Sequence, residues 1–200
     1  SSDTSVIDVK GDNLYLFTNL NAPNGKVVVT DIKTPTPDHW KDLIPETENV
    51  LDVITAGGYI LAKYTVAALT EVKQYDFTGK FIRDIKLPSI GVAGGFSAKE
   101  NQKNTYFWFT NTCTPTSIYK LNLESGETTQ YWKPSINFNS DEYESKQVFY
   151  TSKDGTKVPM TITYKKTTKL DGTAPTLLYG YGGFNAITYP YFGVSTAIWM

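Results

Sequence analysis

"YILAKY" (residues 59–64) is one of three related runs of aromatic and β-branched residues that decide the fold of this chain. The other two are "LYLFTN" (residues 14–19) and "TYFWFT" (residues 105–110). Runs of this composition, bounded by Gly, Asn and Asp, are typical of β-strands. Because the three runs recur at steps of 45 and 46 residues, they indicate an internal repeat.

The repeat includes more than one strand. Aligning Tyr15, Ile60 and Tyr106 also brings a second strand-like run into register at the same steps. These second runs are "VVVTDI" from Val27, "VKQYDF" from Val72 and "IYKLNL" from Ile118. Polar turns follow in "DFTGK" (residues 76–80) and "NLESGE" (residues 122–127), where Gly accepts the positive φ of the turn.

A four-stranded unit that recurs every 40 to 50 residues is the usual sequence pattern of a β-propeller blade. One small sheet cannot bury both of its faces, so neighbouring sheets must stack. A β-sandwich with irregularly spaced strands is the alternative, but the agreement of two strands and a turn favours the propeller. We therefore predict that residues 1–136 form a partial β-propeller of about three blades, too few to close a ring.

The pattern changes after residue 136. The stretch at 131–146 is polar and contains proline, which is typical of an interdomain linker. A hairpin is predicted over residues 147–166, with an Asp-Gly pair at 154–155 in its turn. "PTLLYGYG" (residues 175–182) is then expected to be a buried strand with a glycine-rich exit, which indicates an α/β fold rather than an all-β one.

Composition excludes several classes of partner. The net charge is -1, Arg83 is the only arginine, and no basic run occurs, so nucleic acid is not an expected partner. No apolar stretch reaches the length of a membrane span, and no membrane partner is predicted. No export signal is visible, but an internal piece of a longer chain would not carry one. The cytoplasm is the expected compartment, with the periplasm as the alternative.

Metal and cofactor chemistry is not predicted either. His39 is the only histidine and Cys113 the only cysteine, too few for a zinc site, and a single cysteine forms no intrachain disulfide. His39, next to Trp40 in a polar stretch, is expected on the surface or at a blade edge. Asp141 and Glu142 in the linker are expected to be solvated loop charges rather than an acid–base pair.

The glycine-rich segment "YGYGGF" (residues 179–184) has two interpretations. Its glycines allow a sharp turn close to a substrate, and a tyrosine hydroxyl could donate to a developing oxyanion. The alternative is a structural glycine turn whose aromatic side chains pack on neighbouring residues. The residue types alone leave both interpretations open.

Two segments add a family resemblance. "SKDGTKVPM" (residues 152–160) and "YKKTTKLDGTAPTLLYGYGGFN" (residues 164–185) closely resemble the start of the catalytic domain of prolyl oligopeptidases. That family joins a β-propeller to an α/β-hydrolase serine peptidase domain. The resemblance is strong over residues 145–195. It implies C-terminal propeller blades in 1–136, joined to the truncated first strands of an α/β-hydrolase domain in 137–200.

Carried over by position, the resemblance gives two residues a role. Tyr181 would be the tyrosine that stabilises the oxyanion, and Phe184 would line the apolar pocket for the substrate proline ring. Tyr179 and the neighbouring glycines would shape the loop. The implied activity is hydrolysis of short peptides on the C-terminal side of proline, with the propeller as a size filter.

The catalytic triad is expected outside this chain. No G-x-S-x-G nucleophile elbow occurs in the sequence, and in this fold Ser, Asp and His all follow the glycine-rich loop. The chain, which begins at Ser1, is therefore expected to be an inactive piece of a larger peptidase. Its expected partners are a proline-containing oligopeptide and the remainder of the same polypeptide, and apolar residues in 194–200 are expected to make the isolated piece associate.

Two alternative functions remain at this point. One is a non-catalytic module that binds peptide or protein with its propeller and keeps a degenerate hydrolase domain. The other is a peptide macrocyclase of the same family, which would resolve the acyl-enzyme with an amine instead of water.

Overall fold

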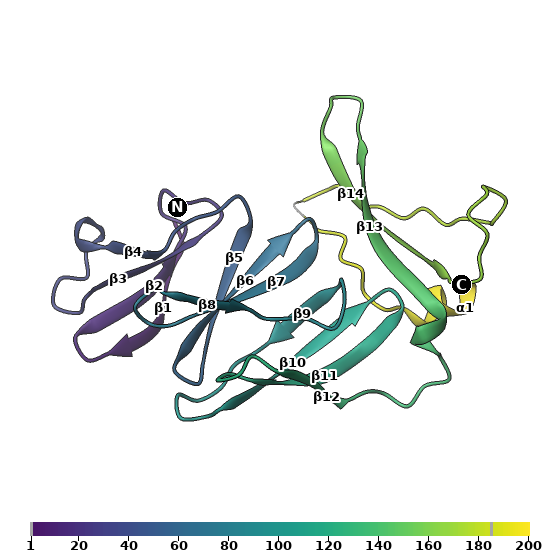
Figure 1. Ribbon diagram of the computed structural model, residues 1–200. Coiled ribbons are helices and arrows are strands. Elements are labelled where there is room, and N and C mark those ends of the chain that lie inside the picture. The colour runs from purple at the N-terminus through teal and green to yellow at the C-terminus, as the bar shows by residue number, and fades with distance from the viewer. Residues whose placement is uncertain (1, 185) are drawn as a thin grey trace.

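A computed structural model describes residues 2–184 and 186–200 (Figure 1). Within these residues the chain forms three four-stranded antiparallel sheets, each a meander in chain order, and then a two-stranded hairpin. The first blade comprises β1 (Thr4–Lys10), β2 (Asn13–Thr18), β3 (Lys26–Asp31) and β4 (Lys41–Ile44). The second comprises β5 (Val50–Ala56), β6 (Tyr59–Val66), β7 (Leu69–Tyr75) and β8 (Phe81–Asp84). The third comprises β9 (Val92–Gly95), β10 (Asn104–Asn111), β11 (Thr114–Asn122) and β12 (Thr128–Trp132).

The second blade is buried on both faces because a neighbouring blade covers each of them. Ile60 and Ala62 of β6 pack with Val27 of the first blade. Leu61, which points to the opposite face, packs with Phe107 of the third blade. All of these side chains are essentially inaccessible to solvent, so the predicted repeat of stacked four-stranded sheets is confirmed.

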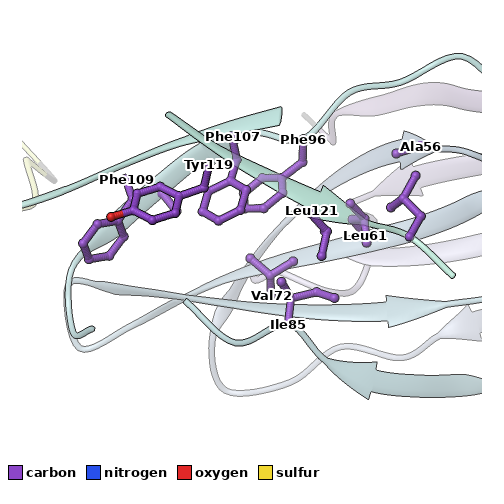
Figure 2. Packing of buried hydrophobic residues seen from close by; sticks show 11 residues of the cluster. Ala56, Leu61, Val72, Ile85, Phe96, Phe107, Phe109, Tyr119 and Leu121 are labelled. Carbon is purple, nitrogen blue, oxygen red and sulfur yellow. The ribbon is translucent and has the colours of Figure 1, made fainter. Parts of the chain in front are cut away.

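The interface between the second and third blades is the more aromatic of the two (Figure 2). Phe107 stacks on Phe96 with ring centroids 4.5 Å apart and on Tyr119 with centroids 5.5 Å apart. The aliphatic side chains of Leu61 and Val72 of the second blade lie opposite these rings. Aromatic rings bury a large apolar area per residue, so this interface contributes strongly to the stack.

The structure corrects the alignment of the repeat by one residue. Tyr15 packs edge-on against Phe77 of the second blade at 4.9 Å, so it faces the following blade. Ile60, its predicted equivalent, faces the preceding blade, whereas Leu61 faces the following one. Because side chains alternate along a strand, a shift of one residue reverses the face. The equivalent positions are therefore Tyr15, Leu61 and Tyr106, at steps of 46 and 45 residues.

The chain leaves the blades through a shorter linker than the sequence predicted. β12 extends to Trp132 and β13 (Tyr143–Thr151) begins at Tyr143, so residues 133–142 make the connection, with a short 3-10 turn at Ser140–Glu142. β13 pairs with β14 (Lys157–Lys165) in the predicted hairpin. The predicted turn is also confirmed, because Gly155 has a φ of +89° beside the Asp154 side chain.

The predicted strand at 175–182 is wrong for this structure. No strand forms there in the described residues, and the side chains of Leu177 and Leu178 are 63% and 82% exposed. A buried strand needs a pairing partner for its backbone and cover on both faces. The described residues offer neither at 175–182, so the predicted buried strand is not formed there. A short helix, α1 (Val194–Trp199), is the only α-helix in the described part, and no helix there could span a membrane.

Candidate functional site

The glycine-rich loop (residues 179–184) lies after the hairpin and is open to solvent. The Tyr181 side chain is 54% exposed and the Phe184 side chain 99% exposed. The alternative interpretation, in which these aromatics pack on neighbouring residues, is therefore not what the structure shows for Phe184. A hydroxyl donor and an apolar side chain are instead presented on one accessible loop.

The backbone of this loop is strained at one position. Phe184 has a φ of +56°, a conformation that favours glycine and costs a side-chain-bearing residue about 1–2 kcal/mol. The backbone turns here, since the amide of Ala186 donates to the carbonyl of Gly183 at 3.0 Å. Strain of this kind is frequent where a loop is shaped for a ligand.

Gly183 leaves room for the Tyr181 side chain. A Cβ added at Gly183 would lie 3.4 Å from the Tyr181 hydroxyl oxygen, which is close to ordinary van der Waals contact. The hydroxyl of Thr188 also reaches back toward the Tyr181 carbonyl at 3.5 Å. The Tyr181 side chain thus lies against the glycine two residues later.

The described residues bring no general base to this loop. His39 lies in the first blade, in the 3-10 turn Pro37–His39, with Nε2 3.3 Å from the Asp38 carboxylate. Its side chain is exposed, as the sequence predicted. Among the described residues, no group of three His, Cys, Asp or Glu side chains could hold a metal ion. The loop can therefore offer a hydrogen bond and an apolar contact, and proton transfer needs groups from elsewhere.

The charges at the base of the hairpin form local ion pairs. Glu142 lies 3.1 Å from Lys165, and this hydrogen bond lowers the pKa of Glu142 and raises that of Lys165. The Lys166 ammonium donates to the carbonyl of Asp141 at 2.8 Å. These exposed pairs hold the linker against β14, and the sequence-based interpretation of both acidic residues as solvated charges stands.

A second region, not identified from the sequence, joins the hairpin to the blades. Two turns on one rim of the blades take part, the β6–β7 turn (residues 67–68) and the β10–β11 turn (residues 112–113), here called the rim turns. Thr112 contacts the hydroxyls of Ser145 and Thr163, and Gln147 reaches the β6–β7 turn. Single Ser, Thr and Gln residues on exposed strands carry no sequence signal, because their partners are more than 30 residues away.

An apolar cavity of about 500 Å³ lies between the linker and α1. Phe138 stacks on Tyr143 at 4.8 Å and meets Phe192 edge-on at 5.2 Å along its wall. Val194 and Ile198 of α1 line the other side and remain largely exposed. The exposed apolar surface predicted for residues 194–200 is confirmed.

Successive four-stranded meanders that bury their faces against one another define a β-propeller architecture. Residues 1–134 match the prolyl oligopeptidase N-terminal β-propeller domain, so the chain belongs to the prolyl oligopeptidase family. The match ends two residues after β12, where the structure leaves the blades.

Relatives align with all or nearly all of the chain. It is 50% identical over 199 residues to a prolyl endopeptidase of Elizabethkingia miricola and 36% identical over 198 residues to the dual function macrocyclase-peptidase POPB of Amanita bisporigera. These alignments cover 100% and 96% of this chain, but only 28% and 27% of the relatives. The chain thus spans little more than a quarter of their length.

Solved structures agree with this assignment. A structure from a study of two prolyl endopeptidases superposes with a TM-score of 0.86 at 36% identity, over 99% of this chain and 29% of the other. Apo prolyl oligopeptidase B from Galerina marginata gives 0.84 at 32% identity, over 98% and 28%.

The expectation about the family is confirmed, but in a coarser form than the sequence suggested. The matched domain is the N-terminal propeller of the family, and the match does not extend to residues 135–200. The finer description, C-terminal blades followed by the start of a catalytic domain, is not part of the match. The roles of Tyr181 and Phe184 stay predictions.

Proposed function

We propose that this protein is part of a serine-type prolyl endopeptidase that hydrolyses short peptides on the C-terminal side of proline. The observation that carries the proposal is the 50% identity, across the entire chain, to a protein named prolyl endopeptidase. The mechanism is acyl transfer through a serine nucleophile and a tetrahedral intermediate.

In this proposal residues 137–200 begin the α/β-hydrolase domain and the blades end at residue 136. Support comes from the change of architecture after β12, where stacked sheets give way to a hairpin and an open loop. Tyr181 donates its hydroxyl to the oxyanion, and Phe184 contacts the proline ring of the substrate. The exposure of both side chains and the strained backbone at Phe184 are consistent with a loop shaped for a ligand.

The chain alone is proposed to be inactive, because the triad is supplied by the remainder of a longer polypeptide. The outer face of the third blade supports such a partner. Tyr106, which is equivalent to Leu61 of the second blade, lies there against Tyr131 at 4.8 Å, and both rings are about half exposed or more. Leu61 uses this position to pack on the next blade, so a further blade fits the same face.

A fluorophosphonate serine probe with intact-mass detection tests the proposal. The 22.3 kDa chain should carry no adduct, and the longest form of the protein should carry one. In that form Tyr181→Phe should lower kcat on a proline-containing peptide by about 10²–10³-fold, the usual effect of losing one oxyanion donor. Tyr179→Phe is the matched control and should retain activity. An adduct on the 200-residue chain, or full activity of Tyr181→Phe, would refute the assignment.

Macrocyclisation is the second candidate, favoured by the 36% identity to a macrocyclase-peptidase. Product masses separate the two reactions, because a cyclic peptide is lighter by one water than the linear hydrolysis product. A longest form that takes no adduct would instead support the non-catalytic binding module.

A further inference from the structure

The last turn of a blade, between its third and fourth strands, has the same form in the second and third blades. It comprises residues 76–80 in the second blade and 122–127 in the third, here called the plug turns. Each begins with an Asp or Asn whose side-chain oxygen accepts two backbone amides of the turn, at 2.8 and 3.0 Å for Asp76 and at 2.9 and 3.0 Å for Asn122. Each also contains a glycine with positive φ. The plug turns are therefore held in shape by their own residues.

An apolar residue follows the Asp or Asn in each plug turn and contacts the preceding blade. The Tyr15 hydroxyl of the first blade donates to the Phe77 carbonyl at 3.3 Å, and the two rings meet edge-on. The Gln74 side-chain amide of the second blade donates to the Leu123 carbonyl at 2.7 Å. A Cβ at Gly57, also in the second blade, would lie 2.4 Å from the Leu123 side chain. Because Phe77 and Leu123 are 46 residues apart, a step of the blade repeat, the two contacts are equivalent.

The glycine of each plug turn also lies against the preceding blade. A Cβ at Gly79 would lie 2.7 Å from the backbone carbonyl oxygen of Leu43 in β4. A Cβ at Gly126 would lie 2.6 Å from Cδ of Arg83 in β8, the only arginine of the chain. The Arg83 guanidinium donates to the Glu124 carbonyl at 2.8 Å. Both glycines thus allow a close approach, one to backbone and the other to a side chain.

Gln74 shows that the contact with the third blade belongs to the core. Its side chain is fully buried, and its Oε1 atom has no hydrogen-bond partner among the described residues. Burying a polar side chain is unfavourable unless it is hydrogen-bonded, so the bond to the Leu123 carbonyl is the one that compensates for this burial. Leu123 is itself buried in the apolar cluster between the two blades. This plug turn is therefore part of the interface between blades.

The first blade has the same pattern without a preceding blade among the described residues. Asp31 and Ile32 stand 45 residues before Asp76 and Phe77. The Asp31 side chain accepts the backbone amide of Lys33 at 2.8 Å, as the first residue of a plug turn does. Ile32, in the position of the apolar plug residue, is 45% exposed. The described residues thus contain two plugs in contact with a blade and one without.

From this repetition we infer that each plug turn binds a socket on the preceding blade and holds its own blade in register there. Tyr15 and Leu43 form the socket of the first blade, and Gln74 and Arg83 form that of the second. Arg83 makes the second socket selective, because its side chain fits only beneath a glycine. Ile32 is the plug for a socket with a hydroxyl or amide donor on a further blade of the longer polypeptide. Only this last expectation rests on the proposed function.

Amide hydrogen exchange, followed by mass spectrometry in the longest form of the protein, measures the opening of each plug turn. Arg83→Ala should increase the opening of residues 122–127 about fivefold, the factor for a typical net hydrogen bond. Lys86→Ala removes an exposed cation just beyond the same strand. It is the matched control and should leave exchange at 122–127 unchanged.

A double-mutant cycle tests the selectivity of the second socket. Gly126→Ala should open residues 122–127 about fivefold more in the wild type than in Arg83→Ala, because the added methyl displaces a guanidinium only where one is present. Gly79→Ala should open residues 76–80 equally with or without Leu43→Ala, because that clash is with backbone. The inference is overturned if Arg83→Ala leaves the third-blade turn unchanged, or if the Arg83 and Gly126 effects simply multiply.

The plug of the first blade is tested in its own turn. Ile32→Ala should speed exchange of residues 31–34 about tenfold in the longest form, because it removes apolar contact with a socket. Unchanged exchange there would refute the third plug. If the Arg83 cycle behaves as expected while this test fails, the failure counts against a further blade in the longer polypeptide and not against the two sockets. Exchange does not depend on peptidase activity, so the proposed function can fail separately.

Discussion

The blades and the segment after them follow the same local rules but differ in packing. Both contain antiparallel strands joined by turns with Asp and Gly. In the blades, side chains on both faces of the second sheet are buried by its neighbours. From residue 133 onward, Pro190 is the only buried residue among those described. Pairing alone therefore makes a hairpin, and stacking of similar sheets makes a core.

The largest expected contrast is between two phenylalanines. Phe107→Ala should cost about 3–5 kcal/mol of unfolding free energy, because it removes a ring stacked between Phe96 and Tyr119. Phe184→Ala should change stability by less than about 0.5 kcal/mol, since that side chain is 99% exposed. Urea unfolding followed by circular dichroism measures both. Equal effects would show that the glycine-rich loop is packed in solution.

A smaller contrast is expected between two glycines with positive φ. A Cβ at Gly57 would lie 2.3 Å from the Gln102 carbonyl oxygen and 2.4 Å from Leu123, so Gly57→Ala should cost about 3 kcal/mol from strain and clash together. Gly155→Ala in the hairpin meets nothing within 4 Å and should cost about 1 kcal/mol from backbone strain alone. Thermal unfolding of the two variants separates the steric clash from the backbone strain. A loss of stability at Gly155 as large as that at Gly57 would contradict the comparison.

The rim opposite the hairpin offers an electrostatic test. Lys10 of the first blade lies 4.3 Å above the Phe77 ring of the second and pairs with Glu100 in the third. Lys10→Met should therefore destabilise the stack by about 1 kcal/mol at low salt and by less at high salt. Lys33→Met, whose pair with Asp12 is largely exposed within one blade, is the control and should have almost no effect. A loss that is independent of salt would assign the effect to packing of the lysine stem.

The smallest expected effect is on the pH dependence of folding stability, and it compares two turns that each contain an aspartate. Hydrogen bonds from Thr78 lower the pKa of Asp76 in the second blade, and one from Ser152 lowers that of Asp154 in the hairpin to about 2. A lowered folded pKa gives stability that is present above the unfolded pKa of about 4 and lost as pH falls through the folded value.

Because only Asp76 lies in the stack, Asp76→Asn should flatten the acid dependence of blade unfolding, whereas Asp154→Asn should not. Melting temperatures between pH 6 and pH 2 test this, and NMR titration should find Asp154 near pH 2. If both substitutions flatten the melting curve equally, the hairpin unfolds together with the blades.

The glycine-rich loop illustrates how far the sequence could predict the candidate site. The residue types at 179–184 left the role of the loop open, and only the family resemblance carried by residues 152–160 and 164–185 gave Tyr181 and Phe184 predicted roles. The positive φ of Phe184 and the exposure of both side chains were not predictable, since they depend on the backbone path and on neighbours. The residues that join the hairpin to the rim turns were equally invisible, because a hydroxyl on a strand carries no information about a partner distant in sequence.

The sequence by itself determined the blade period, two of the strands in each blade and the hairpin turn at residues 154–155, because strand composition and turn chemistry act over a few residues. Only the tertiary structure decided that Leu61 rather than Ile60 is equivalent to Tyr15, because a strand's two faces are distinguished by what covers them. It also decided that residues 175–182 stay unpaired. A strand forms only where another backbone supplies its hydrogen bonds, and that partner is set by long-range contacts.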